Sequence, residues 1–265
     1  MLTTDYVDGA PNWVDLGAPD IDAVSAFYAG LFGWDFEAGG PDVGGYGMFR
    51  LDGKTVAGGV SVTAGQGLPA WSVYFQSADA DATAAAVRRA GGAVLYEPMD
   101  VVDAGRMAVF ADPAGVVFAA WQPWGNTGLD TVTAVGALCW TELYTRDPAA
   151  AAAFYREVFR WEVIEVPFGE DTYTMVKPAG TADDAAFGGL VPIGSDPIED
   201  ASMPYWTPYF EVEDCDVTAA RAEELGGKVR LTPVFMEGVG RFAKLADPYG
   251  ARFAVITSAP PAGAA

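Results

Sequence analysis

The segment Trp13-Val14-Asp15-Leu16 recurs 127 residues later as Trp140-Thr141-Glu142-Leu143. The same shift carries Phe27-Tyr28 onto Phe154-Tyr155. It also matches three single residues with their counterparts, namely Trp34 with Trp161, Tyr46 with Tyr173, and Met48 with Met175. A fixed period of this kind is the signature of an internal repeat. The chain of 265 residues is therefore a tandem duplication.

Two small changes of register interrupt the repeat. Gly58-Gly59 matches Gly188-Gly189 at a shift of 130, and from there onward the shift is 135. The later shift relates Trp71 to Trp206, Tyr74-Phe75 to Tyr209-Phe210, and Asp112-Pro113 to Asp247-Pro248. The pattern predicts domains at 1–124 and 132–258, a linker at 125–131, and a disordered tail rich in Pro and Ala at 259–265.

Each repeat shows the same order of elements. After an alternating strand at 13–17, Asp20 is a suitable helix N-cap, and apolar residues follow at helical spacing. An Asp-Pro-x-Gly turn at 112–115 separates the last two strands. The other expected elements are a helix at 79–90 and strands at 46–51, 55–62, 71–77, 94–96, 106–110 and 116–121. The pattern of each half thus predicts two successive β-α-β-β-β modules, which makes four modules in the whole chain.

The composition excludes several classes of chemistry and of partner. The chain has no histidine, so Ser-His-Asp and Cys-His nucleophilic sites are ruled out. A formal net charge of −21 repels nucleic acid and anionic membrane surfaces. We therefore expect a small-molecule ligand as the partner, no nucleic acid and no membrane. The chain is expected to act as a monomer, in which the two repeats form an internal pseudo-dimer, or as a homodimer.

The location expected from the sequence is cytoplasmic. The first residues, Met1 to Asp5, lack the basic and apolar regions of a signal peptide, and the apolar runs are too short to span a bilayer. Cys139 and Cys215 are too few for a disulfide framework.

The motifs resemble the vicinal oxygen chelate superfamily, which includes glyoxalase I, bleomycin- and fosfomycin-resistance proteins and extradiol dioxygenases. The resemblance is carried by the run from Asp20 through Phe27-Tyr28 to Trp34, by Tyr74-Phe75 before Asp79-Ala-Asp81, and by the 112–115 turn. It implies an α+β fold with a tandem duplication of a glyoxalase-like domain, in which four βαβββ modules form two half-open barrels. In that family the concave side holds a divalent metal and the substrate.

The metal ligands implied by the resemblance are not present in this sequence. The positions of the family's three ligands fall on Trp13, Ser72 and Ala119 in the first repeat and on Trp140, Thr207 and Ala254 in the second. Divalent ions of the expected kind need imidazole or carboxylate donors. The sequence therefore predicts a pocket with no metal and no other cofactor. The alternative is a Mg²⁺- or Ca²⁺-type site made of carboxylates, for which Asp15, Glu142 and Glu211 are the available groups.

The side chains expected to line the concave surfaces follow from the period of two in a strand. They give each surface an aromatic wall with few polar groups, which suits a flat, largely apolar ligand. In the first repeat they are Trp13, Tyr46, Met48, Arg50, Ser72, Tyr74, Gln76, Arg106, Ala119 and Trp121. In the second they are Trp140, Tyr173, Met175, Thr207, Tyr209, Glu211, Arg241 and Ala254.

Asp15 and Glu142 are the candidate catalytic residues. A carboxylate beside an indole can have a raised pKa and act as an acid or base. The alternative is a salt bridge to Arg50, Arg106, Lys177 or Arg241, or simple exposure to solvent.

Three functions remain open at this point. The first is metal-independent binding or sequestration of an aromatic or hydrophobic natural product, as in the antibiotic-resistance members of the family. The second is a metal-free cyclase, isomerase or hydrolytic tailoring enzyme that uses Asp15 or Glu142. The third is a glyoxalase-type metalloenzyme with atypical carboxylate ligands.

Overall fold

The computed structural model describes residues 2–40, 43–63, 65, 67–168, 171–195 and 198–260. Residues 261–265 of the predicted disordered tail lie outside the described residues. The first repeat contains β1 (Pro11–Ala18), α1 (Ile21–Phe32), β2 (Asp35–Glu37), β3 (Gly47–Leu51), β4 (Lys54–Ser61), β5 (Ala70–Gln76), α2 (Ala80–Arg89), β6 (Ala93–Val101), β7 (Gly105–Ala111) and β8 (Val117–Pro123). The second contains β9 (Leu138–Thr145), α3 (Pro148–Phe159), β10 (Glu162–Phe168), β11 (Asp171–Lys177), η2 (Asp183–Ala185), β12 (Gly188–Pro192), η3 (Ile193–Ser195), β13 (Tyr205–Glu211), α4 (Cys215–Glu224), β14 (Lys228–Met236), β15 (Gly240–Ala246) and β16 (Arg252–Ser258).

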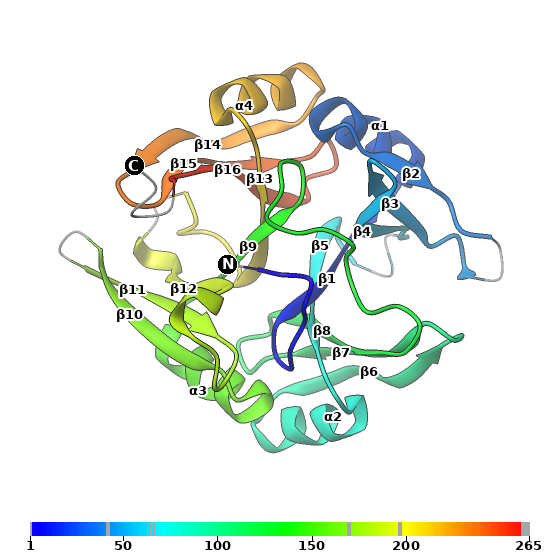
Figure 1. Cartoon of the computed structure of the whole chain (residues 1–265), viewed down its shortest axis with the longest axis vertical. Helices are drawn as coiled ribbons and strands as arrows, with labels where there is room; N and C mark the ends of the chain where they lie inside the picture. Colours follow the sequence, from blue (N-terminus) through cyan, green and yellow to red (C-terminus); the bar gives the residue numbers. More distant parts are fainter. Residues whose placement is uncertain are drawn as a thin grey trace. The chain divides into compact units, whose positions relative to one another are not determined.

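The strands form two eight-stranded sheets, one from each repeat (Figure 1). Their orders are β2-β3-β4-β1-β5-β8-β7-β6 and β10-β11-β12-β9-β13-β16-β15-β14. Among the described residues, the first and last strands of each order are not paired, so neither sheet closes into a barrel. This confirms the predicted α+β fold, a tandem duplication of four βαβββ modules in half-open sheets.

Most predicted elements are present, with two differences. The short strand β2 was not predicted, because its three residues carry no alternation long enough to detect. Strand β6 runs over Ala93–Val101, well beyond the predicted 94–96. Two register shifts against β7 interrupt its pairing, so its inward and outward side chains do not alternate regularly.

The strand register corrects the predicted match between Gly58-Gly59 and Gly188-Gly189. Gly58 pairs with Asp15 on β1 and with Met48 on β3. Gly189 occupies the same place in the second repeat, since it pairs with Glu142 and Met175. The shift between the repeats is therefore 131 at this strand, one more than the sequence match indicated.

The contacts of the chain divide it into two compact units that do not coincide with the repeats. Unit 1 comprises residues 1–14, 72–129 and 140–207, and unit 2 comprises 15–71, 130–139 and 208–265. Unit 1 therefore contains α2 and α3, and these two helices contact each other. Unit 2 contains α1 and α4, which likewise contact each other. Each unit combines one module from each repeat.

In unit 2, a buried polar group links the helix of the first repeat to the last turn of the second. Tyr28 donates a hydrogen bond to Asp247 (3.3 Å) and accepts one from the indole N–H of Trp71 (3.0 Å). The same carboxylate accepts the backbone N–H groups of Tyr249 (2.9 Å) and Ala251 (3.0 Å). Burial raises the pKa of Asp247, and burial together with the Asp247 charge raises the pKa of Tyr28.

Unit 1 contains the same arrangement, but here the tyrosine comes from the second repeat and the aspartate from the first. Tyr155 donates to Asp112 (3.5 Å) and accepts from the indole of Trp206 (3.1 Å). Asp112 accepts the backbone N–H groups of Ala114 (2.8 Å) and Val116 (2.9 Å). Burial raises the pKa values of Asp112 and Tyr155 in the same way. The Phe-Tyr and Asp-Pro-x-Gly motifs therefore meet between repeats and serve the core of each unit.

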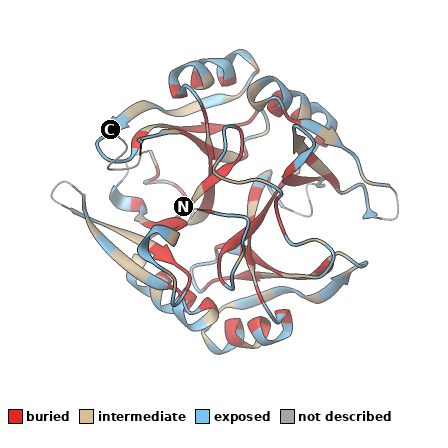
Figure 2. Cartoon of the chain, in the orientation of Figure 1, coloured by how far each residue is buried: buried red, intermediate tan, exposed pale blue. Residues whose placement is uncertain are grey.

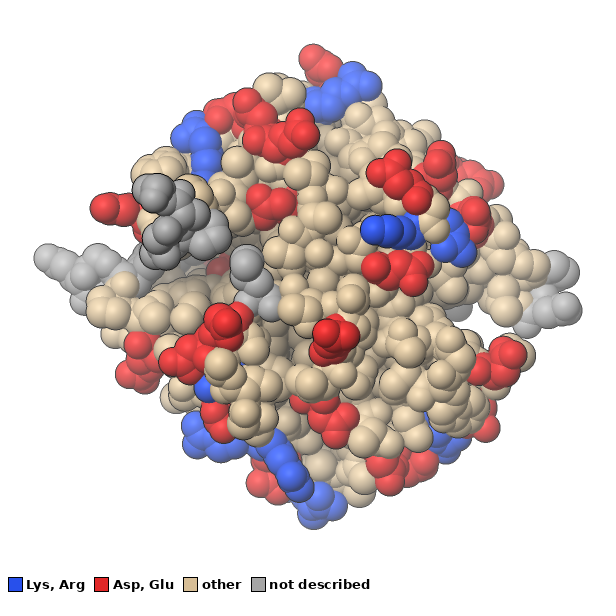
Figure 3. Space-filling view, viewed as in Figure 1, with Lys and Arg blue, Asp and Glu red and all other residues tan. Residues whose placement is uncertain are grey.

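Acidic side chains are scattered over the face shown in Figure 3. Around each helix, buried and exposed residues alternate, so one side packs on the sheet and the other faces solvent (Figure 2). No helix among the described residues is long and apolar enough to cross a membrane.

Candidate functional site

The positions of the family's metal ligands carry side chains that do not fit a divalent ion. Ala119 and Ala254 are buried methyl groups, and Trp13 and Trp140 supply indoles, which donate but do not ligate. Ser72 and Thr207 supply only hydroxyl groups at the remaining positions. Within the described ranges, no group of three or more Cys, Asp or Glu residues lies close enough together to hold a metal.

The carboxylates of the alternative metal site have other partners. Glu211 accepts hydrogen bonds from the backbone N–H of Ser258 (2.8 Å) and from its hydroxyl (2.5 Å). Cys139 lies close enough for the Glu211 charge to raise its pKa, although burial is the larger cause. Glu211 is thus part of the end of the sheet in unit 2.

The most developed polar cluster surrounds Glu142 in unit 1. Tyr173 on β11 donates to one carboxylate oxygen (2.7 Å), and Tyr144 on β9 donates to the other (2.6 Å). The indole N–H of Trp140 donates to the Tyr173 hydroxyl (3.1 Å). Hydrogen bonds to an ionised carboxylate are stronger than neutral ones, at about 1.5–3 kcal/mol each. The cluster holds a negative charge in a fixed position between two phenols.

Gly189 makes the contact between Tyr173 and Glu142 possible. Met175, Gly189 and Glu142 lie in one row across β11, β12 and β9. A Cβ atom at Gly189 would lie 1.9 Å from the Tyr173 hydroxyl and 2.3 Å from its ring carbon. The phenol therefore crosses directly over the glycine to reach the carboxylate, and no other residue fits beneath it.

A pair of stacked rings borders the Glu142 cluster. Tyr144 is buried, and its ring stacks on Tyr205 of β13 with centroids 5.3 Å apart and planes 17° apart. Offset stacking of this kind contributes about 0.5–1.5 kcal/mol beyond the burial of area. The corresponding residues of the first repeat are Gly17 and Ala70, which have no ring.

The phenol of Tyr173 is held in its neutral form. Burial raises its pKa most, and the Glu142 charge and the hydrogen bond to that charge raise it further, while the bond from Trp140 lowers it. Tyr173 is consequently a hydrogen-bond donor to the carboxylate throughout the physiological pH range.

The equivalent carboxylate of the first repeat is Asp15, in unit 2. It is buried, and Tyr46 donates to it over 3.2 Å. Met48 and Gly58 lie in its row, as Met175 and Gly189 lie in the row of Glu142. The structure therefore brings together Asp15 with Tyr46, and Glu142 with Trp140 and Tyr173, while a role for these residues in binding or catalysis stays a prediction.

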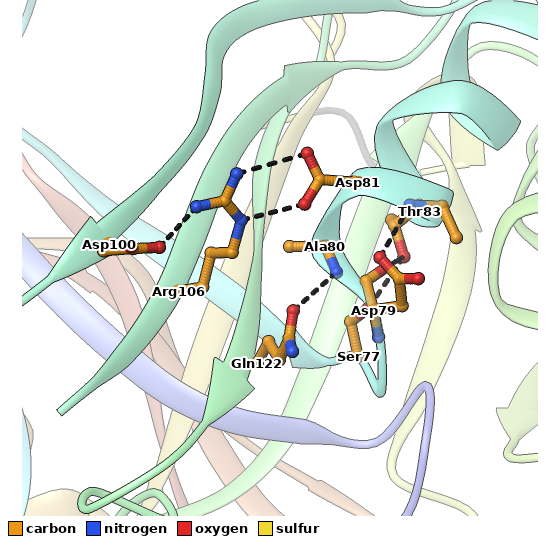
Figure 4. Close-up of polar contacts among 9 residues, drawn as sticks. Ser77, Asp79, Ala80, Asp81, Thr83, Asp100, Arg106 and Gln122 are labelled. Carbon is orange, nitrogen blue, oxygen red and sulfur yellow. Dashed lines mark hydrogen bonds and ion pairs between the residues drawn. The ribbon is translucent and has the colours of Figure 1, made fainter. Parts of the chain in front are cut away.

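The cationic candidates are engaged in ion pairs with other acids. Arg106 lies between Asp81 of α2 (2.9 Å) and Asp100 of β6, beside the capped start of that helix (Figure 4). Arg241 pairs with Asp216 of α4 in the same way. Arg50 pairs with Glu37 and Lys177 with Glu162 and Asp183, at the edges of their sheets. These contacts anchor helices and strands, and a role in ligand binding for Arg50, Arg106 and Arg241 stays a prediction.

The other predicted residues lie on the central strands. In unit 1, Gln76 accepts from Asn12 (3.4 Å) and donates to the carbonyl of Tyr6 (3.0 Å), and Trp121 donates to the carbonyl of Asn126 (2.8 Å). Tyr74 pairs with Ala119 in the strand register, and Tyr209 with Ala254. Tyr74 and Tyr209 are buried, and Ser72 is half-buried.

Two surface hollows in unit 1 lie apart from all of these residues. One, of about 340 Å³, is lined by the N-terminal segment and by residues around η2, including Leu2, Val7 and Phe187. The other, of about 250 Å³, lies beside the start of α3 and contains Arg146 and Met203. Neither contains a predicted site residue or a cluster of chemically active groups.

Three residues of the Glu142 cluster were not among the predicted site residues. Tyr144 and Tyr205 have no aromatic counterpart in the first repeat, so matching the repeats could not identify them. Gly189 was hidden by the one-residue error in register. The change from Gly17 to Tyr144 is the sequence signal that marks the difference between the two sites.

The two half-open sheets built from βαβββ modules define the class of protein to which the chain belongs. The model of the Glyoxalase/Bleomycin resistance protein/Dioxygenase superfamily matches residues 10–120 and 137–255, and the chain belongs to that superfamily. It is 40% identical over 271 residues to the anthracycline biosynthesis protein DauV of Streptomyces sp. (strain C5), covering 96% of this chain and 94% of that protein. It is 38% identical over 264 residues to the putative glyoxylase CFP32 of Mycobacterium bovis (strain ATCC BAA-935 / AF2122/97), covering 97% and 98%.

Solved structures support the fold alone. The Mn(II)-bound glyoxalase from Novosphingobium aromaticivorans superposes with a TM-score of 0.64 at 19% identity, over 95% of this chain and 83% of that one. The 2,3-dioxygenase LapB from Pseudomonas sp. KL28 gives a TM-score of 0.62 at 14% identity, over 96% and 95%.

Proposed function

We propose that this protein binds a planar aromatic natural product without a metal ion, and holds it rather than transforming it. The observation that carries the proposal is the Glu142 cluster. Both carboxylate oxygens accept phenol hydroxyls, so neighbouring side chains hold Glu142 in place. What the cluster offers to a ligand is largely aromatic surface.

The relatives support this class of ligand. Two curated relatives are named for anthracycline biosynthesis, one from Streptomyces sp. (strain C5) and one, 39% identical, from Streptomyces peucetius. The aglycone of an anthracycline is a fused-ring quinone, largely flat and apolar, with oxygen atoms at the ring edges. Trp140, Met175 and Tyr205 are half-buried and would present ring faces and a thioether to such a ligand. We propose a cytoplasmic location as well, which fits the two buried, unpaired thiols Cys139 and Cys215.

A binding experiment with a defined probe tests the proposal. The purified protein is titrated with a hydroxylated anthraquinone, and binding is followed by quenching of tryptophan fluorescence and by native mass spectrometry. The expected result is a saturable complex that is unchanged by a chelator, from which the quinone is recovered intact.

Each other outcome would count against a separate part of the proposal. Binding that is lost on chelation and restored by Mg²⁺ or Mn²⁺ would reject metal independence and favour an atypical carboxylate site. Recovery of a chemically altered quinone would reject sequestration and favour the metal-free enzyme that uses Asp15 or Glu142. A probe that does not bind at all would reject the aromatic ligand.

A further inference from the structure

One buried hydroxyl beside the Glu142 cluster has no hydrogen-bond partner. Thr207 is 2% exposed, and its Oγ1 atom is one of two buried side-chain polar atoms without a partner in the described part of the chain. The other is Oδ1 of Asn12, whose amide nitrogen already bonds to Gln76. Buried hydroxyls are nearly always paired, because an unpaired one costs about 1–3 kcal/mol. The buried hydroxyl of Thr207 is therefore an exception that favours a partner outside the chain.

The strand places Thr207 on the face that carries the cluster. Trp206 points into the core of unit 1, where it contacts Tyr155 and Trp161. Its neighbour Tyr205 points the other way and stacks on Tyr144. Because alternate residues of a strand share a face, Thr207 projects to the same side as Tyr205.

The alternation of the two strands puts Thr207 and Glu142 on the same face of the sheet. Near the other end of the same strand pair, the N–H of Glu211 donates to the carbonyl of Ala137 (3.0 Å), so residue numbers rise along β9 as they fall along β13. Glu142 lies two residues before Tyr144 and Thr207 two residues after Tyr205, so both share the face of the Tyr144–Tyr205 stack.

We propose that Thr207 supplies the hydrogen bond that orients an oxygen-bearing aromatic ligand in the second repeat. The inference rests on the proposed function and names the ligand group, a carbonyl or phenol oxygen at the edge of a planar ring system. Glu142 is an acceptor in both of its phenol hydrogen bonds and has no N–H or O–H group to offer a ligand oxygen. Trp140 likewise donates its only N–H to Tyr173. Thr207 supplies a buried hydroxyl on this face that has no hydrogen-bond partner among the described residues.

The test compares Thr207→Val with two controls. Valine has the same shape without the hydroxyl, Thr207→Ser retains the hydroxyl, and Thr232→Val makes the same deletion at an exposed position of β14. Affinity is measured for a hydroxylated anthraquinone and for anthracene, which lacks oxygen. We expect Thr207→Val to weaken anthraquinone binding about three- to tenfold and to leave anthracene binding unchanged. Thr207→Ser and Thr232→Val should bind both probes as the wild type does.

Thermal unfolding separates a ligand-directed hydroxyl from a structural one. Replacing an unpartnered hydroxyl by a methyl group should leave the melting temperature of Thr207→Val equal to or above that of the wild type. A lowered melting temperature would show a structural partner and overturn the inference, as would anthraquinone affinity equal to that of the wild type. If the wild type binds neither probe, the proposed function fails and this inference fails with it.

Discussion

Asp15 in the first repeat and Glu142 in the second occupy equivalent strand positions, but the side chains around them differ. In the second repeat, Glu142 accepts Tyr173 at 2.7 Å and Tyr144 at 2.6 Å. In the first, the bond from Tyr46 to Asp15 spans 3.2 Å, and the residue at the position of Tyr144 is Gly17. The longer glutamate reaches both phenols, and the stack of Tyr144 on Tyr205 fixes one of them.

The buried cores show the opposite behaviour. The group of Tyr28, Trp71 and Asp247 in unit 2 matches that of Tyr155, Trp206 and Asp112 in unit 1, bond for bond. The duplication has therefore kept the parts that hold each unit together and let the carboxylate sites diverge. We infer that the second repeat carries the more specialised site.

Removing either core carboxylate should have the largest effect, and the two effects should be equal. Asp112→Ala leaves the hydroxyl of Tyr155 and the N–H groups of Ala114 and Val116 without an acceptor. Asp247→Ala does the same in unit 2. Each should lower the free energy of unfolding by about 3–5 kcal/mol, measured by urea denaturation. A cost more than twice as large in one unit would break the equivalence of the cores.

Substituting Gly189 should come next, and it acts on the second site alone. In Gly189→Ala the new Cβ would meet the Tyr173 ring, which must swing away from Glu142 and Trp140. We expect a loss of about 2–3 kcal/mol in unfolding free energy and loss of anthraquinone binding. Gly194→Ala is the control, since no described atom lies within 4 Å of its Cβ position. Wild-type behaviour of Gly189→Ala would show that the phenol does not cross the glycine.

The sequence predicted the fold because both repeats carry the same signals in the same order. Asp20, Asp79, Asp147 and Asp214 each cap a helix, and the apolar stripe of α1 is buried where its spacing placed it. The sequence could not predict which motifs contact each other. Each repeat has an Asp-Pro-x-Gly turn whose aspartate could accept the hydrogen bond from Tyr28, and nothing in the spacing selects Asp247 over Asp112.

The part of the candidate site that occurs in both repeats could be predicted from the sequence. The alternation of side chains along a strand and the match between the repeats placed Glu142, Trp140 and Tyr173 on one surface, and hydrogen bonds link them in the structure. Tyr144 and Tyr205 were missed because their importance lies in a difference between the repeats. Their contact also depends on how β9 lies against β13, which is a property of the sheet rather than of either segment.

Deleting the equivalent phenol hydroxyls should show the divergence directly, with a smaller effect. Tyr173→Phe loses a short bond to Glu142 and the bond from Trp140, and should lower the unfolding free energy by about 1.5 kcal/mol. Tyr46→Phe loses the longer bond to Asp15 and should cost about 0.5 kcal/mol. Denaturation of both variants under one set of conditions measures the difference. Equal costs would mean that the two carboxylate sites are not energetically distinct.

The smallest effect should appear in the alkaline titration of Tyr173. Burial raises its pKa first and the Glu142 charge second, so Glu142→Gln should lower the pKa of Tyr173 while leaving it above its ordinary value of about 10. Below about pH 10 this tyrosine is protonated in the folded and unfolded chain alike, and its contribution to stability is constant. Above that pH the unfolded chain loses the proton first, so the free energy of unfolding falls as the pH rises. The fall should be smaller in Glu142→Gln, because the pKa values of Tyr173 in the folded and unfolded chain are then closer together.

The phenol carbon signals of ¹³C-labelled tyrosine, assigned with Tyr173→Phe, report this titration residue by residue. Asp15→Asn is the matched control, and it should leave the Tyr173 signal unchanged while acting only on the site that contains Tyr46. A Tyr173 pKa that does not move in Glu142→Gln would mean that the Glu142 charge does not act on the phenol, and would contradict the hydrogen bond between the two side chains.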